Sequence, residues 1–319
     1  MSPRLYKDKT SSCQEIIIWC FKDGKAGHES QTEGLCAALK SKHSVVVKNC
    51  LIKQSLFLFI LKLSWFKSKK WPWHGYQKPS LIVGAGHITH LWMLFARVFY
   101  GGKIIVLMKP SLPHTFFDTL IVPYHDLNGK NMKISNIIYT KGVLNDIKYS
   151  NKTLAARGLI LIGGVSKHYY WDEESVLEQI NNLLKRNPNI QWEITTSRRT
   201  PISTTNKLTN IRFSNSKFTP YSNTDENWVK TRMKIASRVW VTQDSISMIY
   251  EALSSGSEIG LISLSSINPS SRALKSIQSL LEEKLITINQ KLDENIVKRT
   301  KYFNESERCA DLILSKLLQ

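Results

Sequence analysis

Acidic residues are missing from a long stretch in the first half of this 319-residue sequence. From position 34 to position 117 there is no Asp or Glu, whereas the same stretch contains twelve Lys and Arg, and the whole chain has a formal net charge of +19. Solubility alone does not require such segregation, so we expect this part of the chain to face an anionic partner. The candidates are membrane lipid, nucleic acid and a phosphorylated substrate.

The sequence also has few cysteines and lacks the common motifs of metal and redox enzymes. Its five cysteines are scattered and never spaced CxxC, which argues against a disulfide framework or a structural zinc site and favours a reducing compartment. It contains no DxD, GxGxxG, YxxxK, HExxH, GxSxG or Walker A motif. We therefore expect chemistry that needs neither a bound metal nor a redox cofactor.

No hydrophobic run approaches the ~20 residues that cross a bilayer. The first apolar run, 16–21, is too short for a signal peptide, so the sequence predicts a cytoplasmic protein. The most apolar run, 56–66, contains Lys62 and is followed by lysines and aromatic residues, a pattern typical of a surface that rests on a membrane. A buried amphipathic helix with a solvated lysine loop is the alternative. The expected membrane-facing residues are Leu56, Phe57, Phe59, Trp65, Lys67, Lys69, Lys70, Trp71 and Trp73.

Short β-branched runs alternate with helical stretches along the whole chain, which predicts an α/β protein with parallel sheets. The expected strands form two series, 16–21, 44–49, 81–83, 103–108, 119–122 and 136–139, and then 158–163, 191–195, 211–213, 238–242, 258–262 and 285–288. We expect two Rossmann-like domains, 1–150 and 151–319, facing each other across a cleft, with the last helix returning to the first domain.

Ligands of open α/β sheets bind at the carboxyl ends of strands, so the loops after each run are informative. In the first half, DGKAGHESQ follows a strand and supplies His28 and Asp23, both able to exchange protons. These two are the predicted catalytic residues; a capping Asp23 and a merely exposed His28 are the alternative. On the acceptor side we expect Gly24, Gly27, Gly86, His87 and Asp126.

In the second half, three loops carry hydroxyl groups and cations suited to a diphosphate. They are LIGGVSK, TTSRRTP and VTQDSISMIYEA, the last of which opens a predicted helix whose N-terminus favours an anion. Glu251 lies two turns into that helix, within reach of a ribose diol. An ordinary helix cap with an exposed glutamate is the alternative. The predicted donor-binding residues are Gly164, Ser166, Lys167, Thr196, Ser197, Arg198, Arg199, Asp244, Ser245, Ser247, Met248 and Glu251.

These motifs, in the same order, resemble the family of mitochondrial-fission (elongated mitochondria) proteins and their bacterial relatives, which are described as candidate glycosyltransferases. The resemblance extends from about position 17 to position 263. It implies a GT-B architecture in which the second domain holds a nucleotide-sugar donor and the first holds the acceptor. The turn GKAGH is also similar to a loop of the GT-B transferase that completes lipid II.

Together these features predict a metal-independent GT-B glycosyltransferase that acts on a cell-envelope lipid or saccharide. It would be cytoplasmic and peripherally bound to the inner face of the cell membrane, and hexosyl, N-acetylhexosaminyl and Kdo-type donors all stay open. The alternative is a non-catalytic, membrane-associated adaptor. Nucleic acid is not an expected partner, because the basic stretch contains no recognised nucleic-acid module.

Overall fold

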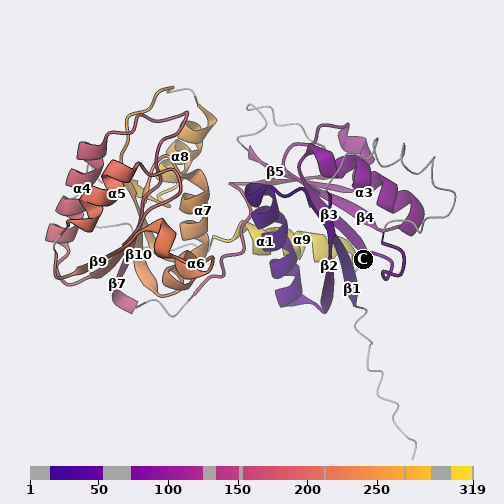
Figure 1. Ribbon diagram of the computed structural model, residues 1–319. Helices are drawn as coiled ribbons and strands as arrows, with labels where there is room; N and C mark the ends of the chain where they lie inside the picture. Colours follow the sequence, from indigo (N-terminus) through magenta and orange to yellow (C-terminus); the bar gives the residue numbers. More distant parts are fainter. Residues whose placement is uncertain are drawn as a thin grey trace, which may run out of the picture. The chain divides into compact units, whose positions relative to one another are not determined.

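The computed structural model describes residues 15–52, 73–124, 134–150, 154–211, 213–268, 271–288 and 303–317. The chain divides into two compact units, and the helices and strands of each are drawn in Figure 1. The first unit comprises Met1–Ile121, Ile134–Ile138 and Ala310–Gln319, and the second comprises Val122–Lys133 and Tyr139–Cys309. The predicted residues Asp126, Leu56, Phe57, Phe59, Trp65, Lys67, Lys69, Lys70 and Trp71 lie outside the described part of the chain.

A six-stranded sheet with the order β2-β1-β3-β4-β5-β6 organises the first unit. The register pairs from β2 through to β5 are parallel. The elements are β1 (Ile16–Lys22), α1 (Ala26–Lys42), β2 (Val45–Leu51), β3 (Leu81–Ala85), α3 (His87–Tyr100), β4 (Lys103–Leu107), η1 (His114–Phe116), β5 (Thr119–Pro123) and β6 (Ile137–Thr140). Six consecutive residues of β1 are buried, as expected for a central parallel strand covered on both faces.

The second unit contains another six-stranded sheet, with the order β12-β11-β10-β7-β8-β9 and only parallel pairs. Its elements begin with β7 (Leu154–Leu161), α4 (Glu173–Arg186), β8 (Gln191–Thr195), α5 (Ile202–Thr209), β9 (Ser216–Thr219), η3 (Tyr221–Asn223) and α6 (Trp228–Met233). They continue with β10 (Ala236–Thr242), α7 (Ile246–Ser255), β11 (Glu258–Ile262), α8 (Arg272–Glu282), β12 (Thr287–Ile288) and α9 (Glu305–Leu317), whose last residues, from Ala310 on, belong to the first unit. In that unit Lys42 Nζ lies 2.9 Å from Asp311 Oδ1.

Two apolar cores cover the opposite faces of the second sheet, because right-handed crossovers in opposite directions place their helices on opposite sides. Val176, Ile180 and Leu183 of α4 pack with Ile160 and other buried residues on one face. On the other face the helices α6, α7 and α8 share a second core with alternate residues of β7, β10 and β11. Helix α4 begins at a capping residue, Asp172, whose carboxylate accepts a hydrogen bond from Ser175 N at 3.1 Å.

One strand prediction was wrong. The run 211–213 contains no described strand, and β9 instead begins at Ser216. The edge strand pairs only with β8, so it needs no long apolar run, whereas Ile211 and Phe213 contribute side chains to the core from a loop. The first strand of the second series, expected over 158–163, begins earlier, at Leu154.

Each sheet has one topological switch point, where the chain turns from one side of its first strand to the other. In the first sheet it lies between β1 and β3, and in the second between β7 and β10. Open α/β sheets bind ligands outside the carboxyl ends of the strands at such points. The loops that follow these four strands are therefore the places to look for a site.

Candidate functional site

The loop after β1 positions an aspartate–histidine pair at the first switch point. Asp23 Oδ2 lies 2.8 Å from His28 Nδ1, and the Asp23 side chain is 1% exposed while that of His28 is 20% exposed. Asp23 Oδ1 also accepts a hydrogen bond from Lys25 N at 3.2 Å. Since a carboxylate only accepts, Nδ1 of His28 carries the proton and Nε2 is the nitrogen that can take one from a ligand. The pair can act as an oriented general base.

The loop after β3 packs directly against this pair. Gly86 has a φ of +89°, and a Cβ there would lie 2.5 Å from His28 Nδ1 and 2.7 Å from Asp23 Oδ2. Only glycine satisfies both the backbone angle and the close approach. Gly24, with a φ of +81°, turns the chain between Asp23 and α1, and its N–H donates to Glu29 Oε1 at 3.0 Å.

Most of the catalytic and acceptor-side residues that we expect in the first half lie at the carboxyl ends of β1 and β3. The loop after β1 supplies Asp23 and Gly24, and the first turn of α1 supplies Gly27 and His28. Gly86 packs against the Asp23–His28 pair, and His87 is the exposed first residue of α3. Trp73, expected on a membrane-facing surface, packs instead within an aromatic cluster, with ring centroids 5.7 Å from Trp19, 5.0 Å from Phe21 and 5.7 Å from Trp92.

Three loops of the second unit converge on the buried carboxylate of Asp244. Gly164 N donates to Asp244 Oδ2 at 3.0 Å and Thr242 Oγ1 donates to Asp244 Oδ1 at 2.7 Å. Arg199 Nη2 lies 2.7 Å from Asp244 Oδ2. The Asp244 side chain has no exposed surface, so these partners replace the water it loses. The loops follow β7, β8 and β10, which are neighbours in the sheet.

The guanidinium of Arg199 therefore makes its contacts within the protein. Besides Asp244, its guanidinium donates through Nη1 to Val165 O at 3.0 Å. Both arginines are exposed, but Arg198 differs in its contacts, since its guanidinium carbon lies 5.9 Å from the ring centroid of Tyr221. That the two arginines bind a diphosphate stays a prediction; the observed contacts of Arg199 join its loop to the loops after β7 and β10.

We call the contacts of Gly164, Thr242 and Arg199 with Asp244 the Asp244 junction. The other predicted donor residues make the following contacts. Ser197 Oγ donates to Gly163 O at 2.8 Å, and Thr196 Oγ1 accepts from Tyr221 N at 3.0 Å. Ser166 Oγ accepts from Tyr169 N at 3.2 Å, which closes its own loop. The remaining residues lie nearby along the chain: Lys167 is exposed, Ser245 is the buried N-cap of α7, Ser247 is exposed in the first turn, and Met248 packs against the core.

Two threonines that sequence reasoning missed complete the junction. Thr242 Oγ1 accepts from Gly163 N at 2.7 Å, and Thr200 Oγ1 accepts from Ser197 N at 2.9 Å and donates to Gly163 O. Both lie in motifs that the sequence analysis names, Thr200 directly after Arg199 and Thr242 two positions before Asp244. A hydroxyl at a strand end is the signal that could have found them, because it can satisfy the backbone groups of the neighbouring loop.

Glu251 occupies an unusual electrostatic position one turn after Ser247 on α7. Burial raises the pKa of its carboxyl to about 7, the negative charge of Asp146 adds to the rise, and Lys230 opposes it. Asp146 and Lys230 themselves form an ion pair with a distance of 2.6 Å. Glu251 is thus a partly buried acid that titrates near neutral pH, unlike an ordinary surface glutamate.

Replacing Glu251 by glutamine should make stability less dependent on pH. The native state holds the proton more tightly than the unfolded chain does, so Glu251 favours folding below pH ~4.5 and loses that contribution as the pH rises towards 7. We expect Glu251→Gln to gain about 2 kcal/mol over the wild type between pH 5 and pH 8, measured by urea unfolding. The matched control is Glu178→Gln on the exposed face of α4, which should show no such trend. A trend of the opposite sign would contradict the assignment.

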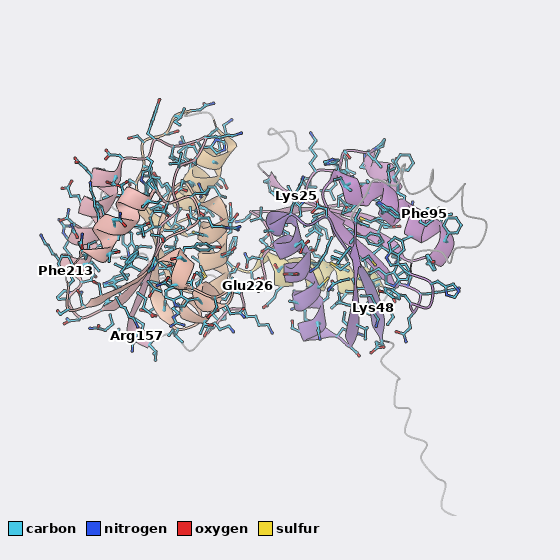
Figure 2. The ribbon with its side chains drawn as sticks, viewed as in Figure 1. Lys25, Lys48, Phe95, Arg157, Phe213 and Glu226 are labelled. Carbon is cyan, nitrogen blue, oxygen red and sulfur yellow. The ribbon has the colours of Figure 1, made fainter. Side chains whose placement is uncertain are left out.

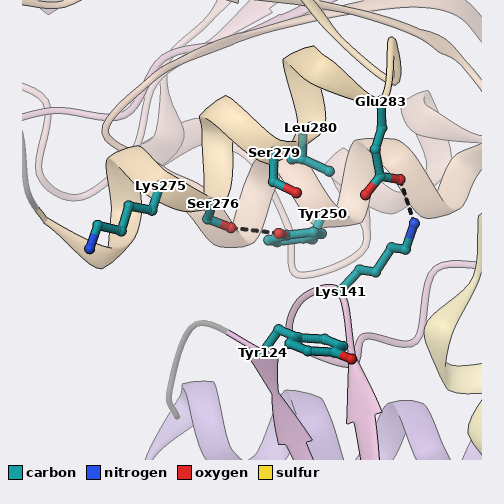
Figure 3. Close-up of a pocket in the computed structure, with 8 residues that line it drawn as sticks. All are labelled: Tyr124, Lys141, Tyr250, Lys275, Ser276, Ser279, Leu280 and Glu283. Atoms are coloured by element: carbon teal, nitrogen blue, oxygen red, sulfur yellow. Dashed lines mark hydrogen bonds and ion pairs between the residues drawn. The ribbon is translucent and has the colours of Figure 1, made fainter. Parts of the chain in front are cut away.

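A pocket with a volume of about 390 Å³ lies elsewhere in the second unit (Figure 3). Tyr250 Oη and Ser276 Oγ are 2.6 Å apart in its wall, and Lys141 forms an ion pair with Glu283. Its lining residues are Tyr124, Lys141, Tyr250, Lys275, Ser276, Ser279, Leu280 and Glu283. None of them was predicted, and none belongs to the Asp244 junction, so the pocket is a separate feature.

The described residues offer few other signals of chemistry. Among them there is no group of three or more His, Cys, Asp or Glu that could hold a metal ion. No helix in the described part of the chain is long and apolar enough to span a bilayer. The four cysteines within it, Cys20, Cys36, Cys50 and Cys309, are buried free thiols.

Comparisons with known proteins agree with the family resemblance. A family model described as "Mitochondrial fission ELM1" matches residues 26–317. The uncharacterized protein RP120 of Rickettsia prowazekii (strain Madrid E) is 26% identical in an alignment of 361 positions, which covers 93% of this chain and 97% of that protein.

Solved structures share the fold at low sequence identity. A Listeria monocytogenes protein described as a candidate UDP-N-acetylglucosamine 2-epimerase has a TM-score of 0.58 and 10% identity, over 95% of this chain and 96% of its own. A further UDP-N-acetylglucosamine 2-epimerase has a TM-score of 0.50 and 11% identity, over 96% of each chain. The two parallel sheets and this likeness confirm the predicted α/β, GT-B-like fold with two Rossmann-like domains. The chain belongs to the mitochondrial fission ELM1 family.

Proposed function

We propose that this protein transfers a sugar from a nucleotide-activated donor to a cell-envelope lipid or saccharide acceptor, without a bound metal. The observation that carries the proposal is that, at the switch point of each sheet, the loops after the strands hold polar side chains that are hydrogen-bonded to one another. One edge holds the Asp23–His28 pair, and the other holds the loops joined by Asp244. Two Rossmann-like units with a polar edge each suit a reaction between two substrates.

The second unit would bind the donor. The Asp244 junction joins the loops after β7, β8 and β10, which carry the exposed cations Lys167 and Arg198 and the N-terminus of α7. Forked guanidinium donors and free backbone N–H groups at a helix N-terminus both favour a diphosphate. As the sugar leaves, they would stabilise the charge that develops on the departing nucleotide.

The first unit would activate the acceptor. In this step, Nε2 of His28 takes the proton of an acceptor hydroxyl while the acceptor oxygen forms a bond to the anomeric carbon of the sugar. The bond from that carbon to the phosphate oxygen breaks, and the nucleotide leaves with the electron pair. Asp23 stabilises the imidazolium that forms, because its carboxylate accepts the Nδ1 proton. A lipid-linked acceptor would explain why an anionic membrane surface is a useful partner of the basic first half.

Calorimetric titration of the purified protein with UDP, CMP and GDP tests the proposal. We expect one of the three to bind, and Arg198→Ala to weaken its binding about tenfold, because one charge-assisted contact to phosphate is lost. The matched control is Arg157→Ala, an exposed arginine of β7 on the opposite edge of the same sheet (Figure 2). An adaptor protein would bind none of the nucleotides, and that result would refute the transferase proposal.

A further inference from the structure

Helix α3 presents an apolar face to solvent. Its other face packs on the sheet through Thr89, His90, Trp92, Met93 and Ala96, which are buried. The residues that point outward are nevertheless apolar as well: Ile88 is 39% exposed, Leu91 49%, Val98 76% and Phe99 50%.

The spacing of these four residues places them along one side of the helix. Phe95, labelled in Figure 2, is half-buried and lies at the middle of α3, with its ring centroid 4.6 Å from that of Phe99. An exposed apolar stripe of this length marks an interaction surface more often than a solvated helix face.

Two exposed lysines lie in the segments next to the C-terminal end of α3. Lys78 and Lys103 are both exposed, and their segments are held together by a hydrogen bond from Lys103 N to Ser80 O at 3.0 Å. Asp118 is the one acid that the described contacts bring to α3. It lies 3.3 Å from Arg97 Nη1, and it also accepts from Ile104 N at 2.7 Å. Its charge is therefore already compensated within the fold.

An aromatic residue of interfacial type lies in the same segment as the first of these lysines. Tyr76 is 42% exposed and meets Trp19 edge-on, with ring centroids 5.9 Å apart. Trp19 in turn contacts Tyr100, the last residue of α3, at 4.8 Å. A tyrosine beside exposed apolar residues and lysines suits the boundary between lipid headgroups and acyl chains.

We propose that the outer face of α3, with Ile88, Leu91, Val98 and Phe99, docks on an anionic lipid surface, and that Lys78 and Lys103 contact the headgroups. Charge decides in favour of lipid over a second copy of this chain, since two such cationic faces would repel each other. The apolar stripe decides against nucleic acid, whose backbone offers it no partner. The inference rests on the proposed function for the use of such docking, namely access to a lipid-linked acceptor.

Flotation with vesicles tests this surface separately from the chemistry. The full chain should bind vesicles of equal parts phosphatidylglycerol and phosphatidylcholine, and bind phosphatidylcholine alone more weakly. The double variant Leu91→Glu with Val98→Glu should lose binding about tenfold or more, because two carboxylates would enter the lipid boundary. Lys78→Gln with Lys103→Gln should weaken binding about tenfold and reduce its dependence on salt. Nucleotide titration of the same variants should be unchanged, so a failed vesicle result and a failed transferase proposal are distinguishable.

Ile202→Glu is the matched control, because Ile202 is an apolar residue of the second unit that is 79% exposed. It should leave vesicle binding unchanged, and circular dichroism should show that all variants are folded. Equal binding by the wild type and the α3 double variant would overturn the proposal and place the lipid contact elsewhere, for example in the apolar run 56–66. A wild type that is dimeric and a double variant that is monomeric would also overturn it, in favour of a second copy as the occupant.

Discussion

Replacing His28 by alanine is expected to lower the rate of sugar transfer by about 10²–10⁴-fold, the usual contribution of a positioned general base. Nucleotide binding should stay nearly unchanged, because His28 belongs to the first unit and the donor residues to the second. The assay is the release of the free nucleotide (UDP, GDP or CMP) from the nucleotide sugar that calorimetry selects, with a membrane lipid extract as the source of acceptor.

The variant Asp23→Asn tests whether the Asp23–His28 pair acts in catalysis or only stabilises the loop. The amide keeps the size of the side chain, but it no longer requires Nδ1 of His28 to carry the proton, so the imidazole can adopt the unproductive tautomer. We expect a rate loss of about 10²-fold or more, with a changed pH profile and little loss of stability. The control is His43→Ala at the opposite end of α1. Undiminished turnover in His28→Ala would remove this residue from the mechanism.

Most of the fold could be predicted from the sequence because its strands are central and parallel. Such strands are buried on both faces and appear as continuous apolar runs, and β1 with its run of isoleucines is the clearest example. The edge strand β9 was not predicted, because its sequence SKFT has no such run and its pairing with β8 depends on tertiary contacts. Pattern therefore predicts the middle of a sheet better than its edges.

The positions of the candidate sites could be predicted from the ends of the parallel strands, but the contacts between their side chains could not. Strand ends identify the loops of Asp23, Gly86, Gly164 and Asp244 because parallel strands bring their carboxyl ends to one edge. That Arg199 meets Asp244, 45 residues further along the chain, is a tertiary fact. A sequence pattern that shows an arginine beside hydroxyls cannot distinguish a residue that binds phosphate from one that binds its own protein.

Replacing Gly164 by alanine is expected to cost about 3 kcal/mol of unfolding free energy and to abolish nucleotide binding. A Cβ at this position would lie 2.5 Å from Thr200 N and closer still to the backbone of Arg199. Backbone atoms cannot turn away as a flexible side chain can, so the loops after β7 and β8 would have to separate. The hydrogen bond from Gly164 N to Asp244 would be strained in the same movement.

Gly27→Ala is the stability control, because no heavy atom lies within 4 Å of a Cβ placed there and alanine is the better helix former. Urea unfolding measures the first effect, and calorimetry with the nucleotide that binds measures the second. Asp244→Ala removes the acceptor of Gly164 N and Thr242 Oγ1, two buried donors, and each buried donor left without a partner costs about 1–3 kcal/mol. If both variants were as stable as the wild type but no longer bound nucleotide, these residues would touch the ligand directly. If Gly164→Ala and Asp244→Ala both bound nucleotide normally, the donor-binding site would lie away from the switch point of the second sheet.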